Sequence, residues 1–261
     1  MSRTRLGATR LLLLGLASLA AHSMPAAAGE KIWLTEPEVA LTLIHRVVIL
    51  RTEVVVDFEV RDSLVTPVDS LISSTVQDAG YEVIPGWVHR RVWEQVVDSL
   101  GGIFDSATGV IDPARAELAD SLAWGAMLAR YDPDAWVHPK LVVHPVDFSS
   151  GTAYLDHATD KVTTSGLPSV GEALFGYRKS GSVNAVSLLI EMQDRNRRRF
   201  FIHGAGIQVL QRHLKGKFVD VPVEERLAIR ERVIHAVEET LKPFVKKTAE
   251  LREKGRMGSP S

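Results

Sequence analysis

The order of two periodicities in residues 46–85 constrains the fold of this chain more than any other feature. Residues 46–60, RVVILRTEVVVDFEV, are rich in β-branched side chains and alternate with period two, which predicts one strand or two. Apolar side chains then recur every three or four positions over 65–80, which predicts a helix, and a short strand follows at 81–85. A strand, a helix and a strand in immediate succession predict a crossover between two parallel strands.

Capping residues mark the ends of this first helix. Thr66 is the predicted N-cap and Pro67 the first helical position, where the missing N–H has no intrahelical partner to lose. Gly80 is placed to end the helix in the left-handed conformation. The same reasoning predicts two more helices, at 86–102 and at 112–131.

The period changes back to two in the second half of the chain. Residues 136–148 predict a strand, and 151–158 predict its hairpin partner. Pro139 and Pro145 lack an N–H donor, so we expect the first of these strands to be irregular or to lie near an edge of the sheet. Residues 159–183 are rich in Gly and show no clear period, which predicts a long loop.

A hairpin and a terminal helix complete the predicted elements. Residues 185–193 and 199–211 read as two strands joined by a turn, because Asp and Asn between them tolerate the backbone angles of a tight turn. An amphipathic helix is predicted over 222–244, with Pro222 at its start. The composition then becomes polar and basic, so 246–261 is predicted to be a flexible tail.

These elements together predict an α/β fold, with a mixed β-sheet, helices packed against it and a C-terminal amphipathic helix. Early alternation of strand and helix favours parallel strands, and the late hairpins favour antiparallel strands in the same sheet. Residues 29–245 are predicted to form a single domain, since about 230 residues suffice for one core. Their sequence shows no internal repeat.

The first 28 residues have the anatomy of a secretory signal peptide. Three arginines precede a short apolar run, Leu11 to Ala21, and an Ala-x-Ala site follows at the end of the segment. We expect cleavage near Ala28 and a periplasmic or secreted mature chain. The apolar run is shorter than the roughly 20 residues of a membrane-spanning helix. No later segment reaches that length without charges, so no transmembrane segment is expected in the mature chain.

Composition excludes several classes of function. The chain has no Cys, so neither a disulfide nor a lipid on an N-terminal Cys is expected. Its 31 Lys and Arg, three of which lie in the leader, are balanced by 32 Asp and Glu. A balanced charge argues against a nucleic-acid surface, so no nucleic-acid partner is expected.

The stretch FIHGAGIQVLQ, 201–211, is the first candidate for chemistry. A His before Gly-Ala-Gly is similar to loops that donate backbone N–H groups to an oxyanion in some esterases. Such a loop also needs a nucleophile, and no Gly-x-Ser-x-Gly occurs in the chain. We therefore interpret 201–211 as a strand in which Gly204 and Gly206 mark a bulge or a close crossing. Ile190 and Met192 are then expected to face Phe200 and Ile202 across the hairpin.

Three histidines form the second candidate. His138 and His144 lie six residues apart on one predicted strand, and His157 lies on its predicted partner. Three imidazoles could hold Zn²⁺, but no His-Glu-x-x-His is present and each of the first two precedes a proline, which favours extended structure by itself. We predict hydrogen-bonded or solvated histidines, and neither a metal, a cofactor nor a catalytic residue.

Three stretches of the sequence resemble a family of bacterial envelope proteins. They are PVDSLISSTVQDAGYEVIP, ARAELADSLAWGAMLARYDPDAWVHPKLVVH and AVSLLIEMQDRNRRRFFIHGAG. The family includes the curli secretion protein CsgG, the lipoprotein LpoB and the amino-terminal domain of TolB, and the resemblance covers residues 45–245. It implies a mixed α/β domain that binds partner proteins in the envelope and catalyses nothing. Many members are anchored through a lipid-bearing Cys, which this chain lacks.

The function expected from the sequence is that of an exported, non-enzymatic envelope protein that binds one or more envelope proteins, in assembly or secretion. Homo-oligomerisation is compatible with this interpretation. The alternative is an exported hydrolase that uses His138, His144 or His157 with a metal, or His203 as a base. Convergence of the histidines on one point in a pocket would favour the alternative.

Overall fold

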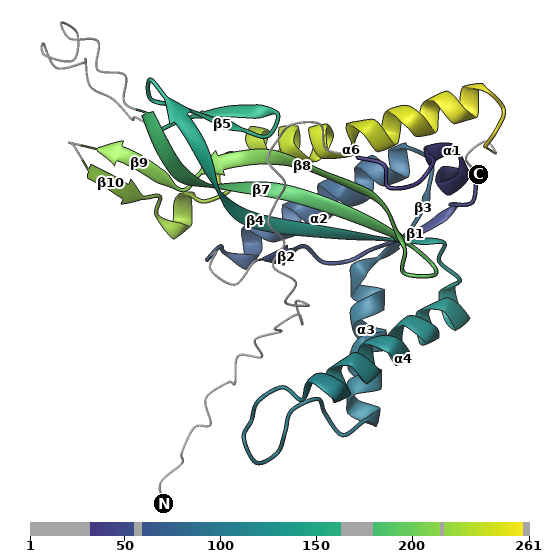
Figure 1. Ribbon diagram of the computed structural model, residues 1–261. Helices are drawn as coiled ribbons and strands as arrows, with labels where there is room; N and C mark the ends of the chain where they lie inside the picture. Colours follow the sequence, from purple (N-terminus) through teal and green to yellow (C-terminus); the bar gives the residue numbers. More distant parts are fainter. Residues whose placement is uncertain (1–31, 55–58, 163–179, 215–216, 258–261) are drawn as a thin grey trace, which may run out of the picture.

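Figure 1 shows the computed structural model, which describes residues 32–54, 59–162, 180–214 and 217–257. The predicted leader, 1–28, lies outside these residues, as does most of the predicted loop at 159–183. The parts of that loop that are described belong to strands at its two ends.

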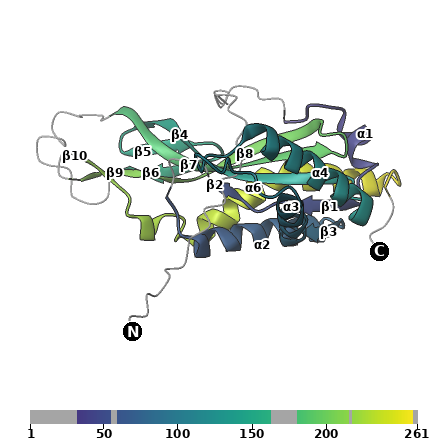
Figure 2. The ribbon, with the colours of Figure 1, turned by 90° about the horizontal axis from the view of Figure 1, so that it is seen from below.

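The β-strands form the centre of the molecule, and helices lie on both sides of them (Figures 1 and 2). The helical segments are α1 (Pro37–Leu41), α2 (Asp62–Asp78), α3 (Gly86–Ser99), α4 (Pro113–Tyr131), the 3-10 turn η1 (Val223–Glu225) and α6 (Arg230–Glu253). The strands are β1 (Arg46–Ile49), β2 (Glu53–Val54), β3 (Glu82–Pro85), β4 (Ala135–Ser149), β5 (Thr152–Leu155), β6 (Ala158–Lys161), β7 (Ser180–Asp194), β8 (Arg199–Val209), β9 (Gln211–Leu214) and β10 (Lys217–Asp220).

The main sheet is mixed, which confirms the predicted α/β class. β1 runs parallel to both β3 and β4, while β4 pairs antiparallel with β7 over its whole length and β7 pairs antiparallel with β8. The connection from β1 through α2 to β3 is the parallel crossover that the alternation of periods predicts. The ribbon β9–β10 forms a separate two-stranded sheet, and neither of its strands was predicted.

The long strand β4 lies inside the sheet, so its predicted place near an edge is wrong. It has β7 on one side and β1, β2 and β5 on the other. Leu50 donates its N–H to the carbonyl of Val137, so the backbone groups of Val137 point away from β7. Pro139 and Pro145 lie two and eight residues further along the strand. Because the direction of the backbone groups alternates with period two, those of both prolines also point away from β7. On the side of β4 that faces away from β7, β1 ends opposite Val137 and β2 begins opposite Lys140. Within the described residues, both prolines therefore sit where no neighbouring strand requires their N–H.

The hairpin β5–β6 curls from the end of β4 to the edge of β8. Ser149 pairs with Thr152 at the start of the hairpin, and at its far end Gly206 donates its N–H to the carbonyl of Asp156 at 2.8 Å. The strands β4 to β8 thus surround an apolar cluster of their own, made of Val146, Phe148, Ala153, Leu155, Val162, Val183, Ala185 and Val209.

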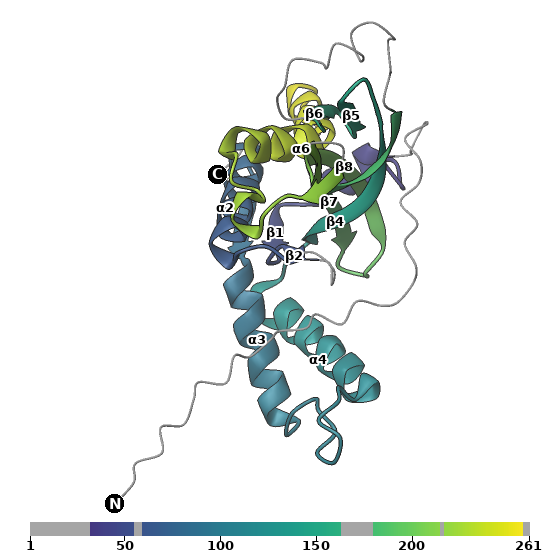
Figure 3. The ribbon, with the colours of Figure 1, turned by 90° about the vertical axis from the view of Figure 1, so that its left-hand side faces the viewer.

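The two faces of the sheet are covered by different helices (Figures 2 and 3). α2 and α6 pack on one face over the largest apolar cluster, which includes Val137, Leu188 and Phe201. On the other face, α3 and α4 cover only one end of the sheet and then project away from it as a helical arm (Figure 3). We call residues 86–131 the α3–α4 arm.

The boundaries of α2 differ from those predicted. The helix begins at Asp62, and Thr66 and Pro67 lie inside it, so the predicted N-cap is wrong. Pro67 has no N–H to donate to the carbonyl of Ser63, so α2 continues through it with one intrahelical hydrogen bond fewer. The predicted end is confirmed: Gly80 has φ of +85° and donates its N–H to the carbonyl of Gln77.

The C-terminal helix begins and ends later than predicted. Pro222 precedes the short turn η1, and α6 starts only at Arg230. The helix then continues through Pro243 to Glu253, into the segment expected to be a tail. Thr248 is buried and lies 2.8 Å from the hydroxyl of Tyr81, and Arg252 donates to the carbonyl of Gly80 at 2.9 Å. The last turns of α6 are therefore packed against the end of α2.

Candidate functional site

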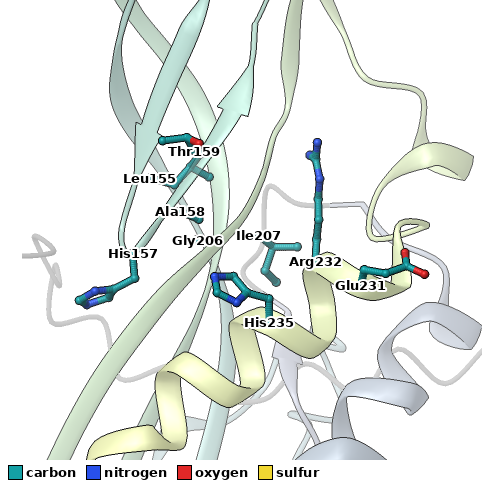
Figure 4. Close-up of a pocket in the computed structure, with 9 residues that line it drawn as sticks. All are labelled: Leu155, His157, Ala158, Thr159, Gly206, Ile207, Glu231, Arg232 and His235. Atoms are coloured by element: carbon teal, nitrogen blue, oxygen red, sulfur yellow. The ribbon is translucent and has the colours of Figure 1, made fainter.

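An open hollow of about 720 Å³ lies between the hairpin β5–β6, the strand β8 and the helix α6 (Figure 4). The hairpin provides one wall, and the first two turns of α6 provide the other. Its polar lining has two imidazoles, one from each wall, together with the carboxylate of Glu231 and the guanidinium of Arg232. The full lining is Leu155, His157, Ala158, Thr159, Gly206, Ile207, Glu231, Arg232 and His235.

His157 reaches this hollow because the hairpin turns sharply at that residue. Its backbone is left-handed, with φ of +57°, and its ring centroid lies 5.0 Å from that of His203 on β8. His203 donates its Nδ1–H to the carbonyl of Thr240 at 3.0 Å, since a carbonyl can only accept. Burial lowers the pKa of His203 below its ordinary value, the Thr240 carbonyl opposes this, and the nearby His157 adds to it. His203 is therefore neutral at pH 7.

The cationic group of the hollow is already neutralised within the chain. Arg232 lies 2.6 Å from a carboxylate oxygen of Asp160, which is almost fully buried. The same oxygen accepts the backbone N–H of Val209 at 2.9 Å. This carboxylate fastens β6 to both β8 and α6, so Arg232 serves the fold and is not available to hold an anion.

The three histidines singled out from the sequence lie in three different settings. His138 stands under α3 and α4, where burial lowers its pKa to about 3 and the charge of Lys140 adds to the effect. His144 is six residues further along β4, a separation of about 20 Å in a regular strand. His157 lies against His203. Within the described ranges, no group of three or more His, Asp or Glu side chains could hold a metal ion.

A hydroxyl and an imidazole do meet on β4 and β7. His144 Nε2 lies 2.8 Å from Ser187 Oγ and 3.7 Å from a carboxylate oxygen of Asp156. In a catalytic triad the carboxylate holds the other ring nitrogen, Nδ1, and the hydroxyl is open to substrate. Here both groups approach the same nitrogen, and Ser187 has 0% of its surface exposed. The contact ties β4, β7 and the β5–β6 hairpin together and offers no nucleophile.

The stretch 201–211 begins as strand β8, so the structural interpretation is confirmed for it. A Cβ on Gly206 would lie 2.2 Å from the Cβ of Leu155, and this close crossing with the hairpin requires glycine. The predicted facing pairs are wrong by one residue: Ile190 lies opposite His203 and Met192 opposite Phe201. The reason is a bulge beside the turn, in which Phe200 is the extra residue.

The basic turn between β7 and β8 is used to hold α4. Arg195 forms an ion pair with Asp132, and Arg197 lies 2.6 Å from a carboxylate oxygen of Asp120. The guanidinium of Arg197 also sits 4.6 Å above the ring of Trp124. These arginines fasten the base of the α3–α4 arm to the sheet.

The α3–α4 arm carries apolar side chains that the body leaves uncovered. Sequence reasoning assigned its helices but did not identify their exposed faces. A helix that packs through one face leaves its opposite face to solvent. Exposed large apolar side chains on the arm are Trp87, Phe104, Val110, Leu118 and Leu122.

The fold defines the class of the protein as a mixed α/β sheet protein with a projecting helical arm. No helix in the described part of the chain is long and apolar enough to span a bilayer. No model of a protein family matches the sequence, and no curated protein matches it either.

Two solved structures match this chain at low similarity. One is the lipoprotein GNA1162 from Neisseria meningitidis, with 14% identity, a TM-score of 0.32 and coverage of 62% of this chain and 81% of that one. The other is a putative neuraminyllactose-binding hemagglutinin homolog from Helicobacter pylori, with 10% identity, a TM-score of 0.33 and coverage of 81% and 89%. TM-scores this low support no conclusion about function, and membership of the CsgG, LpoB and TolB family is not established.

Proposed function

We propose that this chain is an exported, non-enzymatic protein of the bacterial envelope that acts by binding another protein through its α3–α4 arm. The observation that carries the proposal is the set of apolar side chains that the arm exposes to solvent. Leu118 and Leu122 are 48% and 45% exposed and are neighbours on one face of α4. Exposed apolar groups gathered on one element are typical of a protein-binding surface.

The anchoring of the arm supports the same proposal. Its base packs through Val88, Val92 and Met127 against the sheet, and its outer half has a small apolar cluster of its own around Ile103 and Ala119. The arm is therefore held in place before any partner binds, and it can present its surface without a folding step on binding. A preformed surface loses less conformational entropy when a partner binds.

The alternative of an exported hydrolase has less support. The buried Ser187 contacts the imidazole of His144 but has no access to substrate, and the ring of His157 lies against that of His203. An enzyme would need these groups to converge in an accessible cleft.

A pull-down from envelope extract tests the proposal. Mature chain, residues 29–261, is compared with the double variant Leu118→Asp, Leu122→Asp, and with Tyr154→Asp as a control at an exposed apolar residue on β5. We expect one or more envelope proteins to be retained by the wild type and the control and lost from the double variant. Equal retention by all three chains, or turnover in a hydrolase screen that His144→Ala abolishes, would contradict the proposal.

Export is tested separately by the mass of the protein recovered from the cells that make it. The proposal expects a chain that begins at Gly29, after cleavage at the Ala-x-Ala site. Recovery of the full-length chain from the cytoplasm would exclude the envelope location while leaving the binding surface to be judged by the pull-down.

A further inference from the structure

The outward face of α4 carries no charge along its centre. The opposite face is buried against α3 and the sheet through Ala116, Ala119 and Met127. On the outward face the charged neighbours, Arg115 and Glu117, lie to the two sides. We call the exposed, uncharged residues between them the α4 stripe: Ala114, Leu118, Ser121, Leu122, Gly125 and Ala129.

The α4 stripe has room for a closely packed neighbour. Around Gly125, no atom apart from the neighbouring backbone of α4 itself lies within 4 Å of the position that a Cβ would occupy. Glycine in the interior of a helix is less favourable than alanine, so nothing in the described fold explains its use here. Beside the two leucines, a position without a side chain lets the backbone of another helix come near.

The charged residues around the α4 stripe indicate which kind of partner fits it. From Glu94 to Glu117 the outer part of the arm has five acidic residues and a single basic one, Arg115. Asp112 lies 3.5 Å from Arg115, and Asp120 is paired with Arg197. Glu94, Asp98 and Glu117 are exposed, and none of them has an ion pair among the described residues. Hydrogen bonds from Thr108 and Ala107 lower the pKa of Asp105 at the tip, which keeps that carboxylate ionised.

We propose that the α4 stripe binds an amphipathic helix of another protein, whose apolar face covers Leu118 and Leu122 and whose flanking Lys and Arg side chains face the acidic outer half of the arm. This inference rests on the proposed function and narrows the partner to one chemical class. A second copy of the arm would bring like charges together. An anionic membrane surface would be repelled for the same reason.

A helix fits this surface better than an extended segment. A strand binds mainly through backbone hydrogen bonds to a sheet edge, and the backbone of α4 is already bonded within the helix. Side-chain packing is then what the stripe can offer, and helices pack by fitting their side chains into one another's grooves. The 19 residues of α4 give a surface about 28 Å long at 1.5 Å per residue.

Three synthetic helical peptides of equal length test the inference with the mature chain. The first has a Leu stripe flanked by Lys, the second has Glu in place of each Lys, and the third keeps Lys but has Gln in place of each Leu. In fluorescence anisotropy at about 0.15 M salt, we expect the first peptide to bind at least about tenfold more tightly than either of the others. Equal binding of the second or third peptide, no binding of the first, or binding to anionic vesicles would overturn the inference.

Gly125→Gln gives a variant that separates binding from folding, because the space around Gly125 is open. We expect its thermal midpoint to be unchanged or higher and its affinity for the first peptide to fall about tenfold or more. Ala249→Gln, the same kind of change at an exposed site on α6, is the matched control and should bind like the wild type. Unchanged affinity in Gly125→Gln would also overturn the inference. If envelope proteins are retained through the arm but no peptide binds, the proposed function stands and this inference fails.

Discussion

Trp124 of α4 stacks on Trp136 of β4, with ring centroids 3.7 Å apart and planes within 15° of parallel. The guanidinium of Arg197 lies on Trp124, at 4.6 Å from its centroid. Trp136 is fully buried, and this stack is one of the contacts that join the α3–α4 arm to the sheet. These two aromatic rings lie at the base of the helix that carries the proposed binding surface.

Replacing Trp136 with Ala should loosen this joint. We expect a loss of about 3–5 kcal/mol in the free energy of unfolding, because a large buried ring is removed and a cavity remains. Urea denaturation followed by circular dichroism measures the change. Trp87→Ala, at a ring that is largely exposed, is the control and should change stability by less than about 0.5 kcal/mol. Similar losses in both variants would show that the stack is not the anchor.

The pKa of His138 predicts a dependence of stability on pH. It falls to about 3 in the folded chain through burial, against about 6.5 in an unfolded one. Above pH 6.5 the imidazole is neutral in both states and contributes nothing. As the pH falls below 6.5 the unfolded state takes up the proton first, so the folded state loses about 1–2 kcal/mol by pH 5.

His138→Gln should remove that part of the pH dependence. Unfolding free energies of the variant and the wild type are compared between pH 7 and pH 5, with His45→Gln, at an exposed histidine, as the control. A slope in His138→Gln as steep as that of the control would mean that His138 is not the group that titrates.

Two glycines should respond in opposite ways to the same substitution. Gly206→Ala would place a methyl group 2.2 Å from the Cβ of Leu155, so we expect a loss of about 1–3 kcal/mol from overpacking. Gly125→Ala meets open space in a helix and should gain about 0.5–1 kcal/mol. Thermal unfolding of the two variants and of the wild type measures both changes in stability. The account of the β5–β6 crossing fails if Gly206→Ala is neutral.

Truncation tests the late end of α6. A chain that stops after Val245 loses Thr248 and Leu251, both buried, and the hydrogen bond from Arg252 to Gly80. We expect its unfolding free energy to fall by about 3–5 kcal/mol. A chain that stops after Met257 keeps these contacts and should match the full-length chain in the same urea titration. If the shorter chain were equally stable, residues 246–253 would be a tail after all.

Local patterns in the sequence predicted the elements whose ends are set locally. Asp112 accepts the N–H groups of Ala114 and Arg115 at the start of α4, and Gly80 adopts the left-handed conformation at the end of α2. The turn between β7 and β8 is also local, since Asp194 accepts the N–H groups of Asn196 and Arg198. A side chain that bonds within four residues leaves a signal that can be read without the fold.

The wrong sequence predictions concern features that depend on contacts between distant residues. The buried N–H of Leu227 bonds to the side chain of Gln208, and Leu227 has φ of +59°, so tertiary contact delays the start of α6. The bulge at Phe200 shifts the pairing of a strand by one residue, which no alternation pattern reveals. The lysines near the end of α6 concealed a continuing apolar spacing, in which Phe244, Thr248 and Leu251 are buried in turn.

The candidate sites also differ in whether they depend on local spacing or on contacts between distant residues. The approach of His157 to His203 depends on the curl of the β5–β6 hairpin, which brings together residues far apart in the sequence. The α4 stripe, by contrast, has helical spacing and could have been found from the sequence once its outward face was known. Only packing at the base of the arm shows which face that is.

Photo-crosslinking in the cells that make the protein tests whether another protein binds at the α4 stripe. A photoreactive amino acid is placed at position 118 on the α4 stripe, or at position 249 on α6 as the control. We expect a covalent adduct with another envelope protein from position 118 and none from position 249, with the attached segment rich in Lys and Arg beside apolar residues. No adduct from position 118, or equal adducts from both positions, would contradict it.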